Sequence, residues 1–260
     1  MELNISDFNI EQIANSGQCF RINKCENNCW EILAFGKILK IKKIDTEKFI
    51  FDCSVSDYQK IWEEYFDLQR DYGKVKNDII KTDDKFLIEA VKYGYGLRIL
   101  KQDTWEMIVS YIISQRNNIP RIKNTIEKLC APFEKNFPSP DMLKNYTEEN
   151  FKNLGLGYRA RYINEIVHSV LDGKLDLAKL KILNYDDAIE YLKRFNGIGQ
   201  KVADCIALFG LNKIGAFPRD VWINRVIEKQ YQGNFDINSF SGFAGIVQQY
   251  MFFYQRYLGK

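Results

Sequence analysis

A glycine-rich segment, together with the acidic residue that follows it, constrains this chain more than any other feature. Asn-Gly-Ile-Gly-Gln-Lys-Val-Ala-Asp-Cys occupies 196–205, and Ala-Phe-Pro-Arg-Asp occupies 216–220. Apolar residues at helical spacing precede Gly197 and resume at Val202, so the glycines separate two helices. Glycine lets a backbone approach a polyanion, and the first N–H groups of a helix favour negative charge. The sequence therefore predicts a phosphate-binding helix-hairpin-helix at 186–210.

Two side chains next to the hairpin carry chemistry. Lys201 lies in the first turn of the second helix, and Asp220 starts a further helix expected over 221–230. An amine can act as a nucleophile, and a carboxylate can stabilise positive charge on a sugar. A blander reading makes Lys201 a phosphate contact and Asp220 only the N-cap of its helix. On these residues alone both readings remain open.

The two segments together resemble the helix-hairpin-helix, Gly/Pro/Asp superfamily of DNA glycosylases, and within it the 8-oxoguanine DNA glycosylase/lyase branch. The resemblance implies that Lys201 is the nucleophile, that Asp220 assists it, and that Gly197 and Gly199 contact the DNA backbone. It also implies a bifunctional enzyme of base-excision repair. Such an enzyme excises 8-oxoguanine from duplex DNA and then cleaves the abasic site by β-elimination.

Residues for the damaged base follow from the same resemblance. The segment from Asn15 to Arg21 resembles one in which a glycine carbonyl, here that of Gly17, accepts a hydrogen bond from the base. A C-terminal helix is expected over 243–257, and its glutamine and phenylalanine would bond and stack on the base. The matching residues are Gln248 and Phe252, with Cys205 packing on the opposite face of the base. Without the family, Phe252 would be core and Gln248 exposed.

Two further segments, 114–121 and 154–161, resemble family segments that meet the opposite strand and the cytosine left behind. The second carries a tyrosine wedge followed by an arginine. The residues implied as DNA contacts are Asn117, Arg121, Tyr158 and Arg159. Each arginine could instead be a solvated charge or a phosphate contact. Arg116 stands where an asparagine is usual, and Trp222 where a phosphate-binding histidine is frequent, so the roles of both positions are open.

The overall pattern predicts an α+β fold. Residues 1–80 read as a β-rich subdomain with an antiparallel sheet, because 29–35 and 38–44 form a hairpin pattern with alternating apolar residues. Residues 81–260 read as a mostly helical glycosylase core. The net charge of +3, from 37 basic and 34 acidic residues, is too small to indicate nucleic-acid binding. A basic face must therefore come from how the charges are distributed.

Neither a metal nor a cofactor is expected. Cys25 and Cys29 are four residues apart, but the single histidine, His168, is remote and no second cysteine pair follows. No cysteine follows Cys205, whereas the iron–sulfur branch of the superfamily carries four near its C-terminus. The chain shows no signal peptide or long apolar run, which favours a cytoplasmic protein with no membrane association. The expected partner is duplex DNA with 8-oxoguanine, preferably opposite cytosine, bound by a monomer.

Two rival functions are weighed against this one. A monofunctional glycosylase for alkylated bases shares the β-rich subdomain and the aspartate but lacks the lysine, so Lys201 argues against it. A non-catalytic DNA-binding module needs the hairpin alone. It gives no reason to combine Lys201, Asp220, Cys205, Gln248 and Phe252 in one chain.

Overall fold

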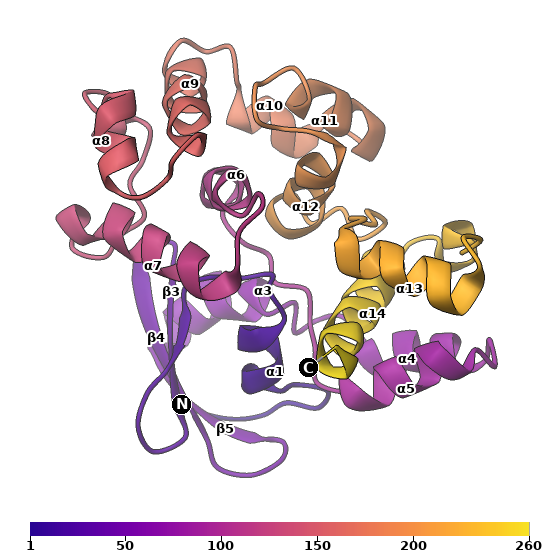
Figure 1. The fold of residues 1–260 in the computed structure, drawn as a ribbon. Helices are drawn as coiled ribbons and strands as arrows, with labels where there is room; N and C mark the ends of the chain where they lie inside the picture. Colours follow the sequence, from indigo (N-terminus) through magenta and orange to yellow (C-terminus); the bar gives the residue numbers. More distant parts are fainter. Residues whose placement is uncertain (260) are drawn as a thin grey trace. The chain divides into compact units, whose positions relative to one another are not determined.

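The computed structural model describes residues 1–259, which form two compact units (Figure 1). Unit 1 is built from three stretches of chain, Met1–Ile32, Ile38–Lys101 and the residues from Asn212 onward. Unit 2 joins a short turn to one long stretch, Leu33–Lys37 and Gln102–Leu211. The expected boundary near residue 80 remains a prediction. It separates β-rich from helical sequence, whereas these units are defined by which segments pack together.

A five-stranded sheet forms the β part of the fold, in the order β1-β5-β4-β3-β2. Its strands are β1 (Glu2–Asn4), β2 (Ile22–Lys24), β3 (Cys29–Ala34), β4 (Lys37–Lys43) and β5 (Lys48–Asp52). In β4 the alternating Leu39 and Ile41 are fully buried while the lysines face outward. From β5, Phe49 packs edge-on against Phe8 with 5.0 Å between ring centroids. The sheet is antiparallel, as predicted.

Helices complete unit 1. They are α1 (Ile10–Asn15), α2 (Val55–Asp57), the π-helical turn Tyr58–Trp62, α3 (Glu63–Tyr65), α4 (Tyr72–Ile80), α5 (Lys85–Tyr93), α13 (Val221–Tyr231), the 3-10 turn Ile237–Phe240 and α14 (Ala244–Leu258). The last helix, α14, packs against both α5 and α13, and α4 packs against α5 (Figure 1). Helices from the second and third stretches of unit 1 therefore pack together.

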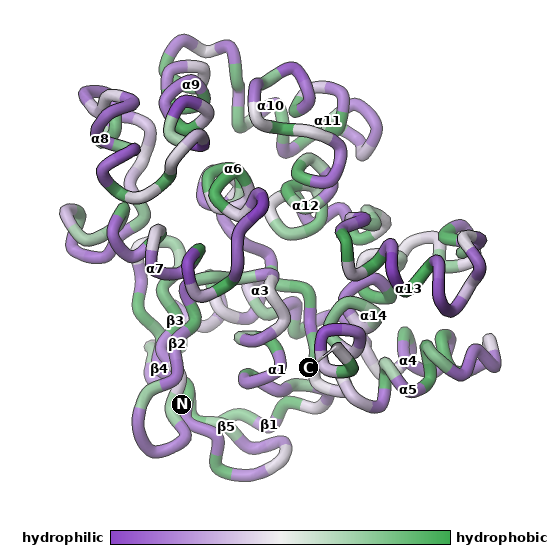
Figure 2. The backbone as a smooth tube through the Cα atoms, in the orientation of Figure 1, coloured by the Kyte–Doolittle hydropathy of each residue, from purple (hydrophilic) through white to green (hydrophobic). Residues whose placement is uncertain are grey.

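Unit 2 is helical. Its helices are α6 (Thr104–Ile113), α7 (Ile119–Cys130), the 3-10 turns Ala131–Phe133 and Asp141–Leu143, α8 (Glu148–Asn153), α9 (Arg159–Leu171), α10 (Leu177–Ile182), α11 (Tyr185–Leu192) and α12 (Gln200–Gly210). Every residue of α6 is buried, because α12, α9, α10 and α7 all pack against it. Figure 2 shows the apolar character of α6 and α12. Within residues 1–259, no helix is both long and apolar enough to cross a membrane.

Candidate functional site

The predicted hairpin is present between α11 and α12 in unit 2. Gly197 adopts a left-handed backbone with φ +84°, and a Cβ there would lie 2.6 Å from the Tyr162 ring of α9. Gly199 is the N-cap residue of α12 and is exposed, with open space where a Cβ would be. Glycine has no side chain to cap a helix, so the first N–H groups of α12 are left for water or an anion.

These two glycines make a matched pair for mutagenesis. Gly197→Ala is expected to lower the free energy of unfolding by about 2–4 kcal/mol, because alanine disfavours positive φ and its methyl group would overlap Tyr162. Gly199→Ala, with φ −89° and open space, is expected to cost less than about 1 kcal/mol. Urea unfolding of both variants measures the difference. Equal losses would contradict this account of the hairpin.

Side chains from neighbouring segments brace the hairpin. The Asn196 amide donates to Glu165 Oε2 at 2.9 Å, and Gln115 Nε2 donates to the Gly197 carbonyl at 2.8 Å. Arg161 Nε donates to the other Glu165 oxygen at 2.7 Å. The hydrogen bond from Arg161, and then that from Asn196, lowers the pKa of the Glu165 carboxyl from its ordinary value. The hairpin is thus fixed from both α9 and the segment after α6.

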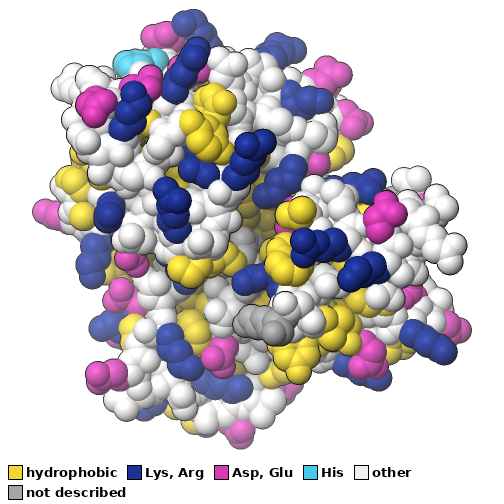
Figure 3. Space-filling view, in the orientation of Figure 1, with side chains coloured by type: hydrophobic (Ala, Val, Ile, Leu, Met, Phe, Trp, Pro, Cys, Tyr) yellow, Lys and Arg dark blue, Asp and Glu magenta, His cyan; other side chains and the backbone are white. Residues whose placement is uncertain are grey.

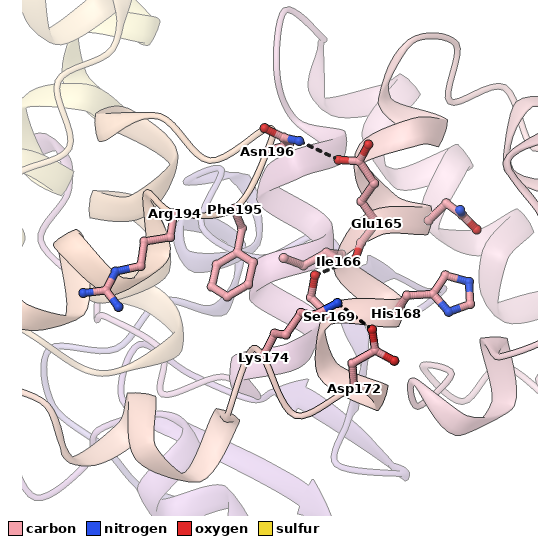
Figure 4. A pocket seen from close by; sticks show the side chains of 10 residues that line it. Glu165, Ile166, His168, Ser169, Asp172, Lys174, Arg194, Phe195 and Asn196 are labelled. Carbon is pink, nitrogen blue, oxygen red and sulfur yellow. Dashed lines mark hydrogen bonds and ion pairs between the residues drawn. The ribbon is translucent and has the colours of Figure 1, made fainter.

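A pocket of about 440 Å³ lies beside the hairpin, between α9 and the end of α11 (Figure 4). Asn196 and Glu165 stand at one edge of it, and Lys174 pairs with Asp172 near another, with 2.9 Å between Nζ and Oδ2. Charges of both signs line this pocket. None of the predicted site residues falls in it.

Lys201 lies in the first turn of α12, next to the buried aromatic rings of Tyr111 and Phe209. Its Nζ is 5.6 Å from the ring centroid of Tyr111 on α6, and Tyr111 stacks on Phe209 with 5.6 Å between centroids. Cys205 follows one turn later on α12 and is buried. The lysine is partly exposed while its aromatic neighbours are not. Sequence reasoning missed Tyr111, because it lies far from the hairpin in the chain and in none of the motifs.

The side chains of Tyr158 and Arg159 both contact the backbone at Gln115. The Arg159 guanidinium donates to the Gln115 carbonyl through both Nε, at 2.8 Å, and Nη2, and it donates to the carbonyls of Arg116 and Leu156 at 3.2 and 3.3 Å. It lies 4.5 Å from the Tyr158 ring centroid, and that ring is 51% exposed. Gln115 therefore connects the hairpin to this arginine, a link that residue spacing did not indicate.

Arg121 and Asn117 lie around the start of α7. The Arg121 side chain is exposed, and its backbone N–H donates to the capping Asn118. Asn117 Nδ2 donates to the Ile113 carbonyl at 3.1 Å. Arg116 is exposed with a left-handed backbone at φ +47°, which is uncommon for a non-glycine residue. On the face of unit 2 seen in Figure 3, Lys and Arg side chains lie across the middle and acidic ones toward the edge.

Asp220 belongs to unit 1, where it caps α13. Its Oδ1 accepts hydrogen bonds from the N–H groups of Trp222 and Ile223, both at 2.9 Å. Asp220 is therefore the N-cap residue of α13. Gln248 Nε2 donates to the Pro218 carbonyl at 3.1 Å, which ties the segment before Asp220 to α14.

The exposure of the two base-binding candidates on α14 differs from what residue spacing alone predicts, which is an exposed Gln248 and a buried Phe252. Gln248 is 4% exposed, whereas Phe252, one turn later on the same face, is only partly buried. A buried, hydrogen-bonded amide beside a partly open aromatic ring suits a binding surface better than a packed core.

Gly17 lies in a turn after α1 and has φ +79°. The next residue, Gln18, is fully buried: its Nε2 donates to Ser16 Oγ and to the Arg98 carbonyl at 2.9 and 2.8 Å. On the other side, Arg256 Nη1 of α14 donates to the Asn15 carbonyl at 3.1 Å. The turn is held from both flanks.

Trp222, at the position that departs from the family, is partly buried. A Cβ on Gly259 would lie 2.9 Å from the Trp222 ring, and the Arg225 guanidinium lies 5.1 Å from its centroid. Arg225 is exposed and sits one turn from the start of α13. A positive charge is therefore available next to this tryptophan.

The thiols and acids do not assemble into a metal centre in the described part of the chain. Within residues 1–259, no three His, Cys, Asp or Glu side chains are placed to hold a metal ion. Cys25 and Cys29 bracket a turn in which the Cys25 N–H donates to the Cys29 carbonyl at 2.8 Å. Within residues 1–259, the six cysteines are not joined by disulfides.

Comparison with known proteins agrees with this geometry. Residues 1–108 match the N-terminal domain of 8-oxoguanine DNA glycosylase, and residues 109–236 match the HhH-GPD superfamily of base excision DNA repair proteins. A solved structure of MBOgg1 with a low-affinity DNA ligand is 37% identical, with a TM-score of 0.93, covering 100% of this chain and 96% of that one. The Clostridium acetobutylicum 8-oxoguanine glycosylase/lyase, solved with DNA containing cytosine opposite 8-oxoG, is 34% identical with a TM-score of 0.89, covering 98% and 94%.

A curated relative, the N-glycosylase/DNA lyase of Saccharomyces cerevisiae, is 35% identical over the matched region. That region covers 53% of this chain and 42% of the yeast protein. Fold, hairpin and matches place the chain in the helix-hairpin-helix, Gly/Pro/Asp superfamily of base excision DNA repair proteins. Within that superfamily, the chain belongs to the 8-oxoguanine DNA glycosylase family.

Proposed function

We propose that the protein is a bifunctional DNA glycosylase, which excises 8-oxoguanine from duplex DNA and then cleaves the strand by β-elimination. The observation that carries this proposal is the partly exposed Lys201 in the first turn after the hairpin, beside the buried ring of Tyr111. A bare DNA-binding hairpin has no need of an amine at that place. We further propose that it acts as a monomer on chromosomal DNA.

The lesion has to leave the duplex before an amine can reach its sugar, at a cost of a few kcal/mol. The hairpin with Gly197 and Gly199 anchors the phosphate backbone through the N–H groups of α12. The exposed Tyr158 ring fills the gap left in the stack. Arg121 and Arg159 donate to the cytosine left behind. Asn117 contacts the same strand of the DNA. These contacts offset the cost of flipping.

The flipped base is read by its edges. 8-Oxoguanine carries a hydrogen on N7 that guanine lacks, and the Gly17 carbonyl accepts it. Gln248 bonds the Watson–Crick edge, while Phe252 and Cys205 pack on the two faces of the base. An unmatched acceptor at Gly17 disfavours guanine by about 1–3 kcal/mol. The remaining discrimination arises earlier on the flipping path.

The chemistry then needs one carboxylate and one amine. As the N-glycosidic bond breaks, positive charge develops on the sugar, and Asp220 stabilises it. The Lys201 amine, once it has lost its proton, attacks C1′, and the bonding electrons leave with the base, which takes up a proton. Ring opening gives a Schiff base between Lys201 and C1′. Loss of a proton from C2′ expels the 3′ phosphate, and hydrolysis of the Schiff base releases the lysine.

One assay tests this function and its preference for cytosine. Duplexes with C, T, G or A opposite 8-oxoguanine are treated with the protein and borohydride, which reduces the Schiff base to a stable adduct. We expect covalent trapping, with excision fastest opposite cytosine, because cytosine O2 and N3 are both acceptors whereas adenine presents a donor at N6. A monofunctional glycosylase would excise without an adduct, and a binding module would do neither.

Alanine variants of Arg121 and Arg159 test which of these residues produces the preference for cytosine opposite the lesion. Arg121→Ala is expected to narrow the rate gap between C and A about tenfold without changing stability, because its side chain is exposed. Arg159→Ala should narrow the gap and also cost about 2–3 kcal/mol of folding stability, because its guanidinium holds several carbonyls. If neither variant narrowed the gap, both arginines would be phosphate or structural contacts.

A further inference from the structure

One face of α14 in unit 1 connects three segments of the proposed site. Gln248, Phe252 and Arg256 follow one another at four-residue spacing, so their side chains lie along one stripe. Gln248 donates to Pro218, just before Asp220. Arg256 donates to Asn15, two residues before Gly17. The proposed function gives Arg256 no role.

The guanidinium of Arg256 contacts both the turn that holds Gly17 and the ring of Phe252. Its guanidinium lies 5.4 Å from the centroid of the Phe252 ring, while its Nη1 donates to the Asn15 carbonyl at 3.1 Å. The planar guanidinium has donors in a fixed fork, so it fixes both partners relative to each other better than a lysine would. The cation–π contact adds to this arrangement.

The other flank of the turn is already rigid. Buried Gln18 holds Ser16 and Arg98, and its Oε1 accepts from the Leu100 N–H at 2.8 Å. The flank at Asn15 is held to α14 by Arg256. Because Arg256 contacts both the Asn15 carbonyl and the Phe252 ring, it couples the position of the turn that holds Gly17 to the position of that ring.

On these contacts we propose that Arg256 is a positioning residue that sets the Gly17 carbonyl against the plane of Phe252, and so determines selectivity for 8-oxoguanine over guanine. The inference rests on the proposed function, since it concerns how the same base is read. Burial lowers the pKa of the Arg256 guanidinium, and the negative charge of Asp220 acts in the opposite direction.

Selectivity, rather than activity alone, is the test. Binding of 8-oxoguanine:C and guanine:C duplexes is measured in a Lys201→Gln background, in which no base is removed. Arg256→Met, which keeps the apolar stem, is expected to lower the ratio of the two affinities about tenfold. Arg256→Lys should recover part of the ratio, because its ammonium keeps one donor near Asn15. Arg70→Met is the control: Arg70 is another partly buried arginine of unit 1, bonded to Asp67.

A second measurement separates positioning from general damage. With Lys201 present, cleavage of a preformed abasic site needs no base reading, so Arg256→Met should leave it within about twofold of the unaltered chain while slowing excision of 8-oxoguanine about tenfold. An unchanged affinity ratio, or an equal loss of abasic cleavage and excision, would overturn the inference. If the unaltered chain neither excises the base nor forms an adduct, the proposed function itself is wrong, whatever Arg256 does.

Discussion

Replacing Lys201 by glutamine is expected to lower base excision by about a thousandfold or more and to abolish the borohydride adduct, because the chain then lacks the amine that attacks C1′. Folding should be little affected, since the side chain is partly exposed and loses only its contact with the Tyr111 ring. Affinity for the damaged duplex should stay within about threefold. Single-turnover excision, trapping and equilibrium binding on the same duplex measure the three effects.

Lys193→Gln is the matched control for that experiment. Lys193 is an exposed lysine at the end of α11, close to the same hairpin, and its Nζ donates to Gln200 at 3.1 Å. Its substitution removes the same charge but should leave the adduct intact. Normal excision by Lys201→Gln would make that lysine a phosphate contact, and the adduct would have to come from another amine.

Asp220→Asn is the second variant with a large expected effect. Asparagine caps helices as well as aspartate does, and its carbonyl oxygen can still accept from Trp222 and Ile223. Stability should therefore change by less than about 1 kcal/mol. Excision should fall by about 10²–10³-fold, because the neutral amide cannot stabilise the cationic sugar. Thermal melting and single-turnover rates are the two measurements.

The chain offers a close match for the capping part of this test. Asp176 caps α10 in the same way, with its Oδ1 accepting from the N–H groups of Ala178 and Lys179 at 2.9 Å each. Asp176→Asn should change neither stability nor excision appreciably. A change in melting temperature alone for Asp220→Asn would reduce Asp220 to a helix cap.

Long, periodic segments were predictable from the sequence. The hairpin pattern at 29–44 became β3 and β4, because alternating apolar residues can bury only one face of a sheet. The helix expected over 243–257 became α14 with nearly the same ends. Glycine chemistry predicted the turn between α11 and α12, since Gly197 needs a backbone that other residues rarely adopt.

Short strands and long-range contacts were not predictable. β1 and β2 have three residues each, too few to show a period, and they exist because a neighbouring strand pairs with them. The segment Tyr58–Trp62 forms a π-helical turn, which residue spacing does not distinguish from an α-helix.

The candidate site likewise has a part that the sequence predicts and a part that it does not. Residue identities followed from motifs, and their roles remain proposals. Their supports were not visible in any motif: Gln115 holding Gly197, Tyr111 beside Lys201, and Arg256 on Asn15. Each support joins residues far apart in the chain, and a single sequence records no such pairing. The burial of Arg159 against backbone carbonyls is a further example.

The three-part composition of unit 1 fixes an order of events during synthesis. Asn15 and Arg256 are separated by 241 positions, and the surface of α5 that receives α14 is made long before α14 itself. Contacts of such long sequence separation form late, because a long loop must close first. Most of unit 2 is one continuous stretch and can fold while it emerges from the ribosome. The surface that we propose to bind the base is therefore completed last, when α14 closes unit 1.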